Sequence, residues 1–322
     1  MDENLETTSR LSRDEMKRLL VRRDGPGLVR FSLQLAAFIL VSLLTLRLAA
    51  AGSPLRLVAA AVDGVLLLTF FASMHEAGHG TAFASQPLAR AVTWVSAVLM
   101  LQSPAFFREF HFEHHRRTSE PDGDPEISGA PSVLGPWPSN PVLYAAVASG
   151  QHLMVGKAFF TLVAALLPRE ELVGRFFPYV RPPLRRRVVV ESRIASALWI
   201  AAAWYGLARV PGFGTLLLAW PVAHVALGLF VMPEHTGLAT SGSQIHRTRS
   251  MRSNALVHWA MWNMSWHAEH HAFPAVPFHA LAELHSRIDA DLENTIDGYV
   301  AFHAEALRRS LGRSGARGQR AA

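Results

Sequence analysis

Four long apolar runs constrain the fold of this chain more than any other feature of its sequence. They occupy residues 31–51, 57–74, 194–208 and 215–232. A helix needs about 20 predominantly apolar residues to cross the hydrocarbon core of a bilayer, and runs of this kind are typical of transmembrane helices. We therefore predict an all-α integral membrane protein with about four spans.

Short turns join these runs in pairs. Residues 52–54 and 210–212 contain glycine and proline, which predicts two transmembrane hairpins that each enter the membrane and return. Two shorter apolar stretches, 91–101 and 158–167, are expected to lie in or dip into the membrane interface, and a crossing by one of them stays open. The predicted organisation has a basic N-terminal segment at 1–30, a membrane domain at 31–290 and a basic C-terminal tail at 291–322.

Basic residues flank both hairpins and orient them. Because cytoplasmic loops carry an excess of arginine and lysine, all three basic regions are expected in the cytoplasm, which requires an even number of spans. Two hairpins satisfy this requirement, and such apolar spans argue against nucleic acid as the partner of the basic runs. The three groups are Arg10, Arg13, Lys17, Arg18, Arg22 and Arg23; Arg181, Arg185, Arg186 and Arg187; and Arg308, Arg309 and Arg313.

Two absences narrow the chemistry further. The chain has no cysteine, which excludes disulfides, thiolate-held zinc and an iron–sulfur cluster within it. No signal peptide is evident, because the first thirty residues are polar and charged.

Three histidine clusters share one spacing. Residues three or four apart lie on one face of a helix, about 5–6 Å from each other, so each cluster can direct its imidazoles at a common point. Eight such histidines exceed the four ligands that zinc usually takes, and imidazole also suits iron. The clusters are His75 and His79; His111, His114 and His115; and His267, His270 and His271.

The predicted topology brings these clusters together. His75 ends the second span, Glu234 and His235 end the fourth, and the other two clusters follow those spans in cytoplasmic segments. All candidate ligands then lie at the inner surface of the membrane, in a histidine-rich helical cap. The sequence therefore predicts a metal centre with room for two ions, a site suited to oxygen chemistry.

These motifs resemble those of the membrane fatty acid desaturase/hydroxylase superfamily. The resemblance extends from about Arg30 to His285, and the sequences Pro-Glu-His-Thr-Gly at 233–237 and Trp-Asn-Met-Ser-Trp-His-Ala-Glu-His-His at 262–271 are similar to bacterial members in particular. It implies a non-haem centre of two iron ions that uses dioxygen to oxidise an unactivated carbon. It also implies a ninth histidine outside the clusters, for which His235 is the best match. No catalytic residue beyond the metal ligands is expected.

Acidic residues near the clusters are candidates for fixing the ligands. A metal-binding imidazole usually donates its second nitrogen to such a partner, and an ordinary polar role at an aqueous face is the alternative for each residue. Asn263, one helical turn before His267, is a further candidate, for supporting a metal-bound water. The acidic candidates are Glu76, Glu113, Glu269, Asp122 and Asp124.

Other interpretations start from the same residues. His75-Glu76-x-x-His79 is also a zinc-protease signature, which would suit an intramembrane metalloprotease, but this interpretation leaves the other two clusters unexplained. A membrane protein that only binds or senses metal would more often carry its histidines in disordered tracts. Metal identity and substrate-linked dioxygen consumption separate these alternatives from an oxidative enzyme.

The resemblance also implies partners, a substrate class and a location. Neither the His-Pro-Gly-Gly signature of a fused haem domain nor ferredoxin-type cysteines occur, so a separate ferredoxin-type electron donor and its reductase are expected. The first two clusters have the spacing of acyl-lipid desaturases, which favours fatty acyl desaturation of a membrane lipid. A hydroxylase or ketolase acting on a carotenoid, an alkane or a small polar compound is the alternative. The expected location is the bacterial inner membrane.

Overall fold

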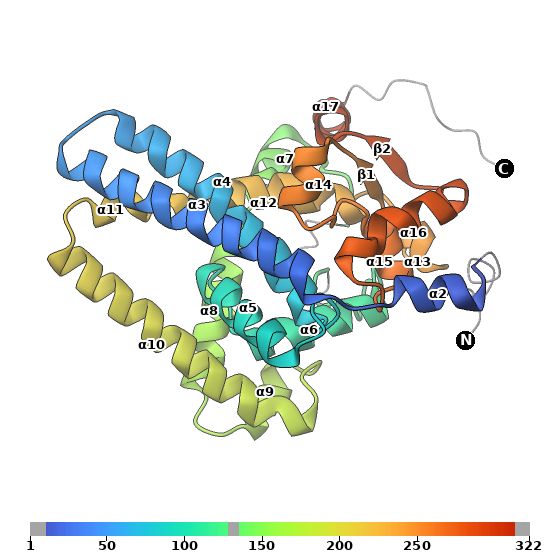
Figure 1. The fold of residues 1–322 in the computed structure, drawn as a ribbon, viewed down its shortest axis with the longest axis horizontal. Helices are drawn as coiled ribbons and strands as arrows, with labels where there is room; N and C mark the ends of the chain where they lie inside the picture. The colour runs from blue at the N-terminus through green and yellow to red at the C-terminus, as the bar shows by residue number, and fades with distance from the viewer. Residues whose placement is uncertain (1–10, 128–134, 313–322) are drawn as a thin grey trace.

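The fold consists of two long helical hairpins and a helical cap at one end of them. The computed structural model describes residues 11–127 and 135–312. In Figure 1 the turns of both hairpins lie at the left, and the cap, formed largely by the C-terminal third of the chain, lies at the opposite end. The hairpins are α3 (Asp24–Ala50) with α4 (Leu55–Gly78), and α10 (Arg185–Arg209) with α11 (Phe213–Leu216) and α12 (Ala219–His235).

The four predicted spans are confirmed. Within the described residues, four helical stretches are long and apolar enough to cross a membrane, and they run through Arg13–Ala50, Leu55–His79, Pro182–Arg209 and Phe213–His235. The helices extend beyond the apolar runs because polar residues continue them. For example, α4 reaches into the first histidine cluster without an interrupting proline or a left-handed glycine.

Shorter helices and one small sheet complete the described chain. The parallel sheet pairs β1 (Ser250–Arg252) with β2 (Thr295–Asp297). The helices are α2 (Arg13–Leu19), α5 (Gln86–Leu99), α6 (Pro104–Arg117), α7 (Pro141–Ala148), α8 (Gln151–Leu166), α9 (Glu171–Phe176), η1 (Pro182–Leu184), α13 (Gln244–Arg247), α14 (Ala255–Ala260), α15 (His267–Ala272), η2 (Phe278–Ala280), α16 (Leu281–Ile288), η3 (Asp289–Asp291) and α17 (Tyr299–Ser310).

The two hairpins meet where α4 crosses α12. A Cβ atom added to Gly64 would lie 2.6 Å from the Cβ of Val222 and 2.7 Å from the carbonyl oxygen of Ala219. Only glycine permits this approach, in the way that small residues let transmembrane helices pack closely. The crossing brings the C-terminal ends of α4 and α12, which carry His75 and His235, to the same end of the bundle.

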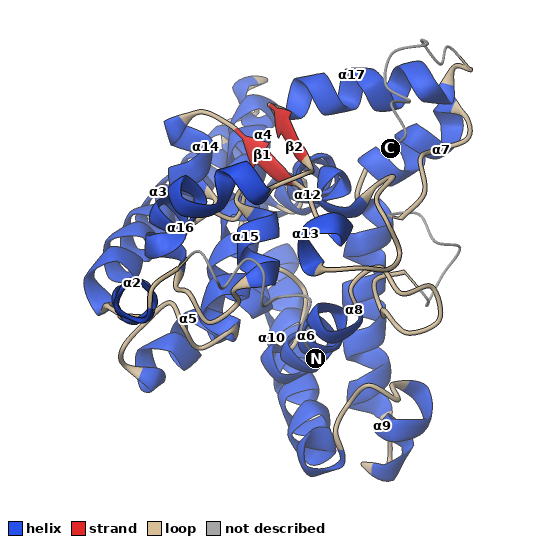
Figure 2. Cartoon of the chain, turned by 90° about the vertical axis from the view of Figure 1, so that its right-hand side faces the viewer, coloured by secondary structure: helices blue, strands red, loops and turns tan. Residues whose placement is uncertain are grey.

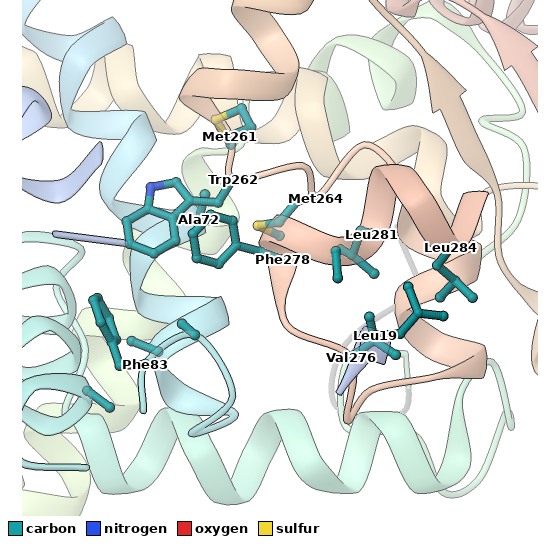
Figure 3. Packing of buried hydrophobic residues seen from close by; sticks show 14 of the residues in the cluster. Leu19, Ala72, Phe83, Met261, Trp262, Met264, Val276, Phe278, Leu281 and Leu284 are labelled. Carbon is teal, nitrogen blue, oxygen red and sulfur yellow. The ribbon is translucent and has the colours of Figure 1, made fainter. Parts of the chain in front are cut away.

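A buried aromatic cluster attaches the cap to the first hairpin. Trp262 and Phe278 lie side by side in Figure 3, with ring centroids 4.6 Å apart, and both are fully buried. The Trp262 indole Nε1 donates a hydrogen bond of 2.9 Å to Gln34 Oε1 on α3. The Arg30 guanidinium donates to the Trp259 carbonyl oxygen at 3.0 Å. Polar bonds and apolar burial thus hold the turn before α15 against the span.

The segment expected as a C-terminal tail contributes to the cap. Figure 2 shows β2 beside β1, with α17 following it. Phe302 and Ala306, four residues apart on one face of α17, are fully buried together with Met232 of α12. This apolar spacing within a basic segment explains why residues 295–310 fold onto the domain. The remainder of the expected tail, 313–322, lies outside the described residues, as do residues 1–10 of the N-terminal segment.

Close packing at the start of α8 yields a stability prediction. Gly150 has φ +62°, and a Cβ there would overlap the carbonyl oxygen of His224 on α12. Gly150→Ala should therefore destabilise the protein by roughly 2–4 kcal/mol, from left-handed strain and overpacking. The matched change Gly156→Ala, in the interior of α8 with only Phe160 nearby, should instead stabilise it by about 0.5–1 kcal/mol. Unfolding in mixed detergent measures both, and equal effects would contradict the described packing.

Candidate metal centre

Four helices supply the nine predicted histidines. The last turn of α4 carries His75, the C-cap residue of α4 is His79, and the end of α12 carries His235. The second and third clusters lie on α6 and α15, where the spacing of three and four residues turns their imidazoles toward the helix ends of the two hairpins. The structure brings all nine together in two groups, and the candidate ligand atoms of each group lie within 4.8 Å of one another.

The first group has five histidines. Four of its Nε2 atoms form a closed ring of contacts: His79 to His111 at 2.8 Å, His111 to His115 at 3.0 Å, His115 to His270 at 3.2 Å, and His270 to His79 at 3.1 Å. A ring of this size leaves its centre about 2 Å from each nitrogen, the usual distance between a metal and an imidazole nitrogen. The fifth member is His75, whose ring lies 4.3 Å from that of His111.

The second group has four histidines, all buried. His267 and His235 face each other through their Nε2 atoms at 3.0 Å. The rings of His114 and His271 lie 5.0 Å apart and complete the group. The two groups touch where His115 stacks on His271, with ring centroids 4.1 Å apart.

The histidine clusters of the sequence do not correspond to the two groups. His114 belongs to the second group and its neighbour His115 to the first, while His271 and its neighbour His270 are divided in the same way. Consecutive residues on a helix project about 100° apart, so the second and third clusters each face two points rather than one. The expectation that each cluster aims at a common point therefore holds for the first cluster only.

Outer partners fix several of the rings through Nδ1. Glu76 Oε1 lies 2.9 Å from His75 Nδ1, and Asp124 Oδ2 lies 2.9 Å from His114 Nδ1. The expectation that Glu76 and Asp124 contact the clusters agrees with this geometry. Further contacts with Nδ1 atoms come from Thr118 Oγ1 to His271 at 3.2 Å, the Arg247 carbonyl oxygen to His235 at 3.3 Å, and Glu234 Oε1 to His267 at 3.5 Å.

Four other candidates face elsewhere. Glu113 pairs with Arg116 and Arg117, and Glu269 accepts hydrogen bonds from Ser250 and His285. Each glutamate follows a predicted ligand by two residues and therefore lies about 200° around the helix from it. Among the remaining candidates, Asp122 is exposed, and Asn263 donates to the Phe278 carbonyl oxygen at 2.8 Å. The expected helical turn between Asn263 and His267 is absent, because α15 begins at His267 and Asn263 has φ +61°.

Sequence reasoning missed three residues around the centre. Thr118, Glu126 and Arg247 all contact the outer nitrogen of a histidine or approach it, and Glu126 Oε2 lies 3.7 Å from His114 Nδ1. Glu126 follows Asp122 and Asp124 in a run with an acidic residue at every second position. This pattern was the sequence signal that could have identified Glu126. The roles of Thr118 and of the Arg247 carbonyl depend on tertiary contacts that no local pattern encodes.

The electrostatics of the site leave most of its imidazoles neutral. Burial and the neighbouring imidazoles hold the pKa of His111, His115 and His270 well below its ordinary value. His114 is the exception. Burial favours its neutral form, but the carboxylates of Glu126 and Asp124 outweigh this effect and raise its pKa to about 9. Neutral imidazoles offer the lone pairs that a metal ion requires.

The donor set fits metal ions better than it fits an imidazole cluster alone. His75 Nε2 and His271 Nε2 are buried without a hydrogen-bond partner among the described residues. A neutral imidazole has only one N–H, so the contacts around the ring of four Nε2 atoms are satisfied by cations more readily than by protons. Two cations, one in each group, would pair these buried nitrogens.

A basic cavity approaches the first group. It has a volume of about 410 Å³ and lies among the end of α4, α5, and the starts of α6 and α10. His79 lines it, and its walls also include four arginines: Arg22, Arg90, Arg108 and Arg187. The cavity therefore offers a negatively charged molecule a route to an imidazole of the centre.

Comparison with known proteins agrees with this arrangement. One similar protein is the Delta(8)-fatty-acid desaturase of Euglena gracilis, which is 22% identical over 204 residues, covering 57% of this chain and 48% of that protein. This chain thus spans about half the length of that curated relative. The sequence model of the fatty acid desaturase family matches residues 27–303, which include both hairpins and all nine histidines. The chain belongs to the fatty acid desaturase family.

Proposed function

We propose that this protein is a dioxygen-dependent fatty acyl desaturase with a centre of two iron ions. The observation that carries the proposal is the convergence of nine imidazoles in two groups, within a chain of the desaturase family. Imidazole-rich sites suit iron, and an all-nitrogen set leaves the ions more positively charged than carboxylate ligands would. The Euglena relative is a Delta(8)-fatty-acid desaturase, which supports this class of substrate.

In this proposal five histidines hold one ion and four hold the other. His75, His79, His111, His115 and His270 would bind the first, and His114, His235, His267 and His271 the second. Iron bound there would supply the activation of dioxygen that removal of hydrogen from an unactivated carbon requires. The protein's own contribution is to orient the ligand rings through Nδ1, chiefly with Glu76 and Asp124, and to exclude water by burial.

The protease alternative has less support. A zinc protease would use Glu76 as a general base on a metal-bound water. Glu76 is fully buried and its Oε1 is engaged by His75 Nδ1, while both histidines of that signature belong to a group of five. An oxidative centre accounts for all nine residues.

Electron supply and orientation complete the proposal. A separate ferredoxin-type donor with its reductase would deliver electrons at the arginine-lined cavity, where an acidic carrier or an anionic headgroup could dock. We propose a multi-pass location in a bacterial inner membrane, with both termini and the metal centre in the cytoplasm. The basic residues before each hairpin support this orientation.

One prediction concerns the partner of His114. Asp124→Asn should weaken iron binding at the four-histidine group about 10- to 100-fold, because the carboxylate orients the ring and raises its basicity. Iron content after dialysis against graded chelator measures this, with wild type expected to hold two ions per chain. Asp122→Asn, an exposed carboxylate two residues away, is the matched control. Equal iron retention in the two variants would contradict the role of Asp124.

A second prediction concerns turnover. Cells that express the wild type with dioxygen and a ferredoxin system should contain lipids with a new double bond, and cells that express His271→Ala should not. His246→Ala is the control, because its imidazole lies outside both groups and contacts Ser243 and Glu293. Lipid mass spectrometry reads the outcome. New hydroxyl or keto products would instead identify a hydroxylase or ketolase, and full activity in His271→Ala would refute the metal assignment.

A further inference from the structure

Lysine is almost absent from this basic chain. Only Lys17 and Lys157 occur, and every other member of its 31 lysines and arginines is an arginine. Lys17 lies on α2 with a largely exposed side chain, 3.4 Å from Asp14 Oδ1. Lys157 lies in the middle of α8 and differs from Lys17 because its Nζ is buried.

The Lys157 ammonium has no hydrogen-bond partner among the described residues. Its Nζ lies 5.0 Å from the centroid of the Phe71 ring on α4, and that ring lies 6.2 Å from the ring of His75. An ammonium has three donors, and a contact with an aromatic face satisfies none of them as a hydrogen bond to oxygen would. Burial of such a group is costly unless an acceptor or an anion occupies its neighbourhood.

Burial lowers the pKa of Lys157 to about 7, and the Glu126 carboxylate offsets only part of this effect. Lys157 interacts electrostatically with Glu126, His152 and His224. Glu126 makes no ion pair with Lys157 within 4.0 Å and instead approaches His114 Nδ1 at 3.7 Å. The imidazoles carry no negative charge, and their Nε2 atoms are themselves buried without partners. Lys157 Nζ and the Nε2 atoms of His152 and His224 are thus buried nitrogens without hydrogen-bond partners among the described residues, and Lys157 interacts electrostatically with both imidazoles.

We propose that Lys157 binds the acyl oxygen of the substrate, either a free carboxylate or the carbonyl of an ester. The inference rests on the proposed function and names the end of the substrate that is held beside the centre. Charge-assisted hydrogen bonds of this kind are strong and directional. Because Lys157 and His75 both lie near the Phe71 ring, Lys157 is a positioning residue that sets how many carbons lie between the acyl oxygen and the oxidised carbon.

Binding of a short probe tests this role without turnover. The metal-loaded protein in lipid nanodiscs is titrated with octanoate, methyl octanoate and 1-octanol, with no electron donor present. Lys157→Met should weaken octanoate binding at least about tenfold, as expected for loss of a hydrogen bond to a charged group, and leave 1-octanol binding unchanged. Lys157→Arg should retain most of the affinity, and Lys17→Met, the exposed lysine, should match the wild type.

The outcomes separate the alternatives. Dependence on Lys157 for octanoate alone identifies a free carboxylate, and dependence for methyl octanoate as well identifies an acyl carbonyl. Octanoate binding that is equal in the wild type and Lys157→Met overturns the proposal, and Lys157→Gln gives the same comparison if the methionine variant does not fold. Because neither dioxygen nor reductant is used, failure of desaturation would leave this result standing.

Discussion

The close crossing of α4 and α12 is the contact on which the metal centre depends. Gly64 allows the backbone of one span to approach Ala219 and Val222 of the other, and this fixes the relation of the two hairpins. His75 and His235 stand at the ends of these helices, about 11 residues beyond Gly64 and 13 beyond Val222, or roughly 16–20 Å along each axis. A wider crossing would move His75 and His235 away from the histidines of α6 and α15.

Burial of so many imidazole rings is energetically unfavourable, and the surrounding residues offset this cost in two ways. Outward-facing Nδ1 atoms find acceptors in Glu76, Asp124 and the Arg247 carbonyl, which leaves the Nε2 atoms pointing inward. The aromatic cluster of Trp262 and Phe278 then holds the α15 segment against α3, so the third cluster stays in place. Apolar packing thus sets the position of the third cluster, and hydrogen bonds set the orientation of rings in the other helices.

Much of this architecture was predictable, because the signals are local. Apolar runs gave four spans, and helical spacing with family resemblance gave the nine histidines. The division of the clusters between two groups was not predictable, because it depends on how α6 and α15 pack. Glu113 and Glu269 contact residues outside both groups, since a residue two positions from a histidine of its cluster faces away from it on a helix. Asn263 contacts the Phe278 carbonyl oxygen instead of lying one helical turn before His267, because residues with positive φ interrupt the helix there.

The division of neighbouring histidines has a mechanical consequence. His114 and His115 on α6, and His270 and His271 on α15, each place consecutive residues in different groups. Adjacent Cα atoms are about 3.8 Å apart across a trans peptide, whatever the helix does as a whole. Covalent geometry, rather than the packing of one helix on another, therefore sets the distance between the two groups. Sliding or tilting of α6 or α15 would move both consecutive histidines of that helix together. Thermal motion of the bundle would therefore change the spacing of the two groups far less than their position.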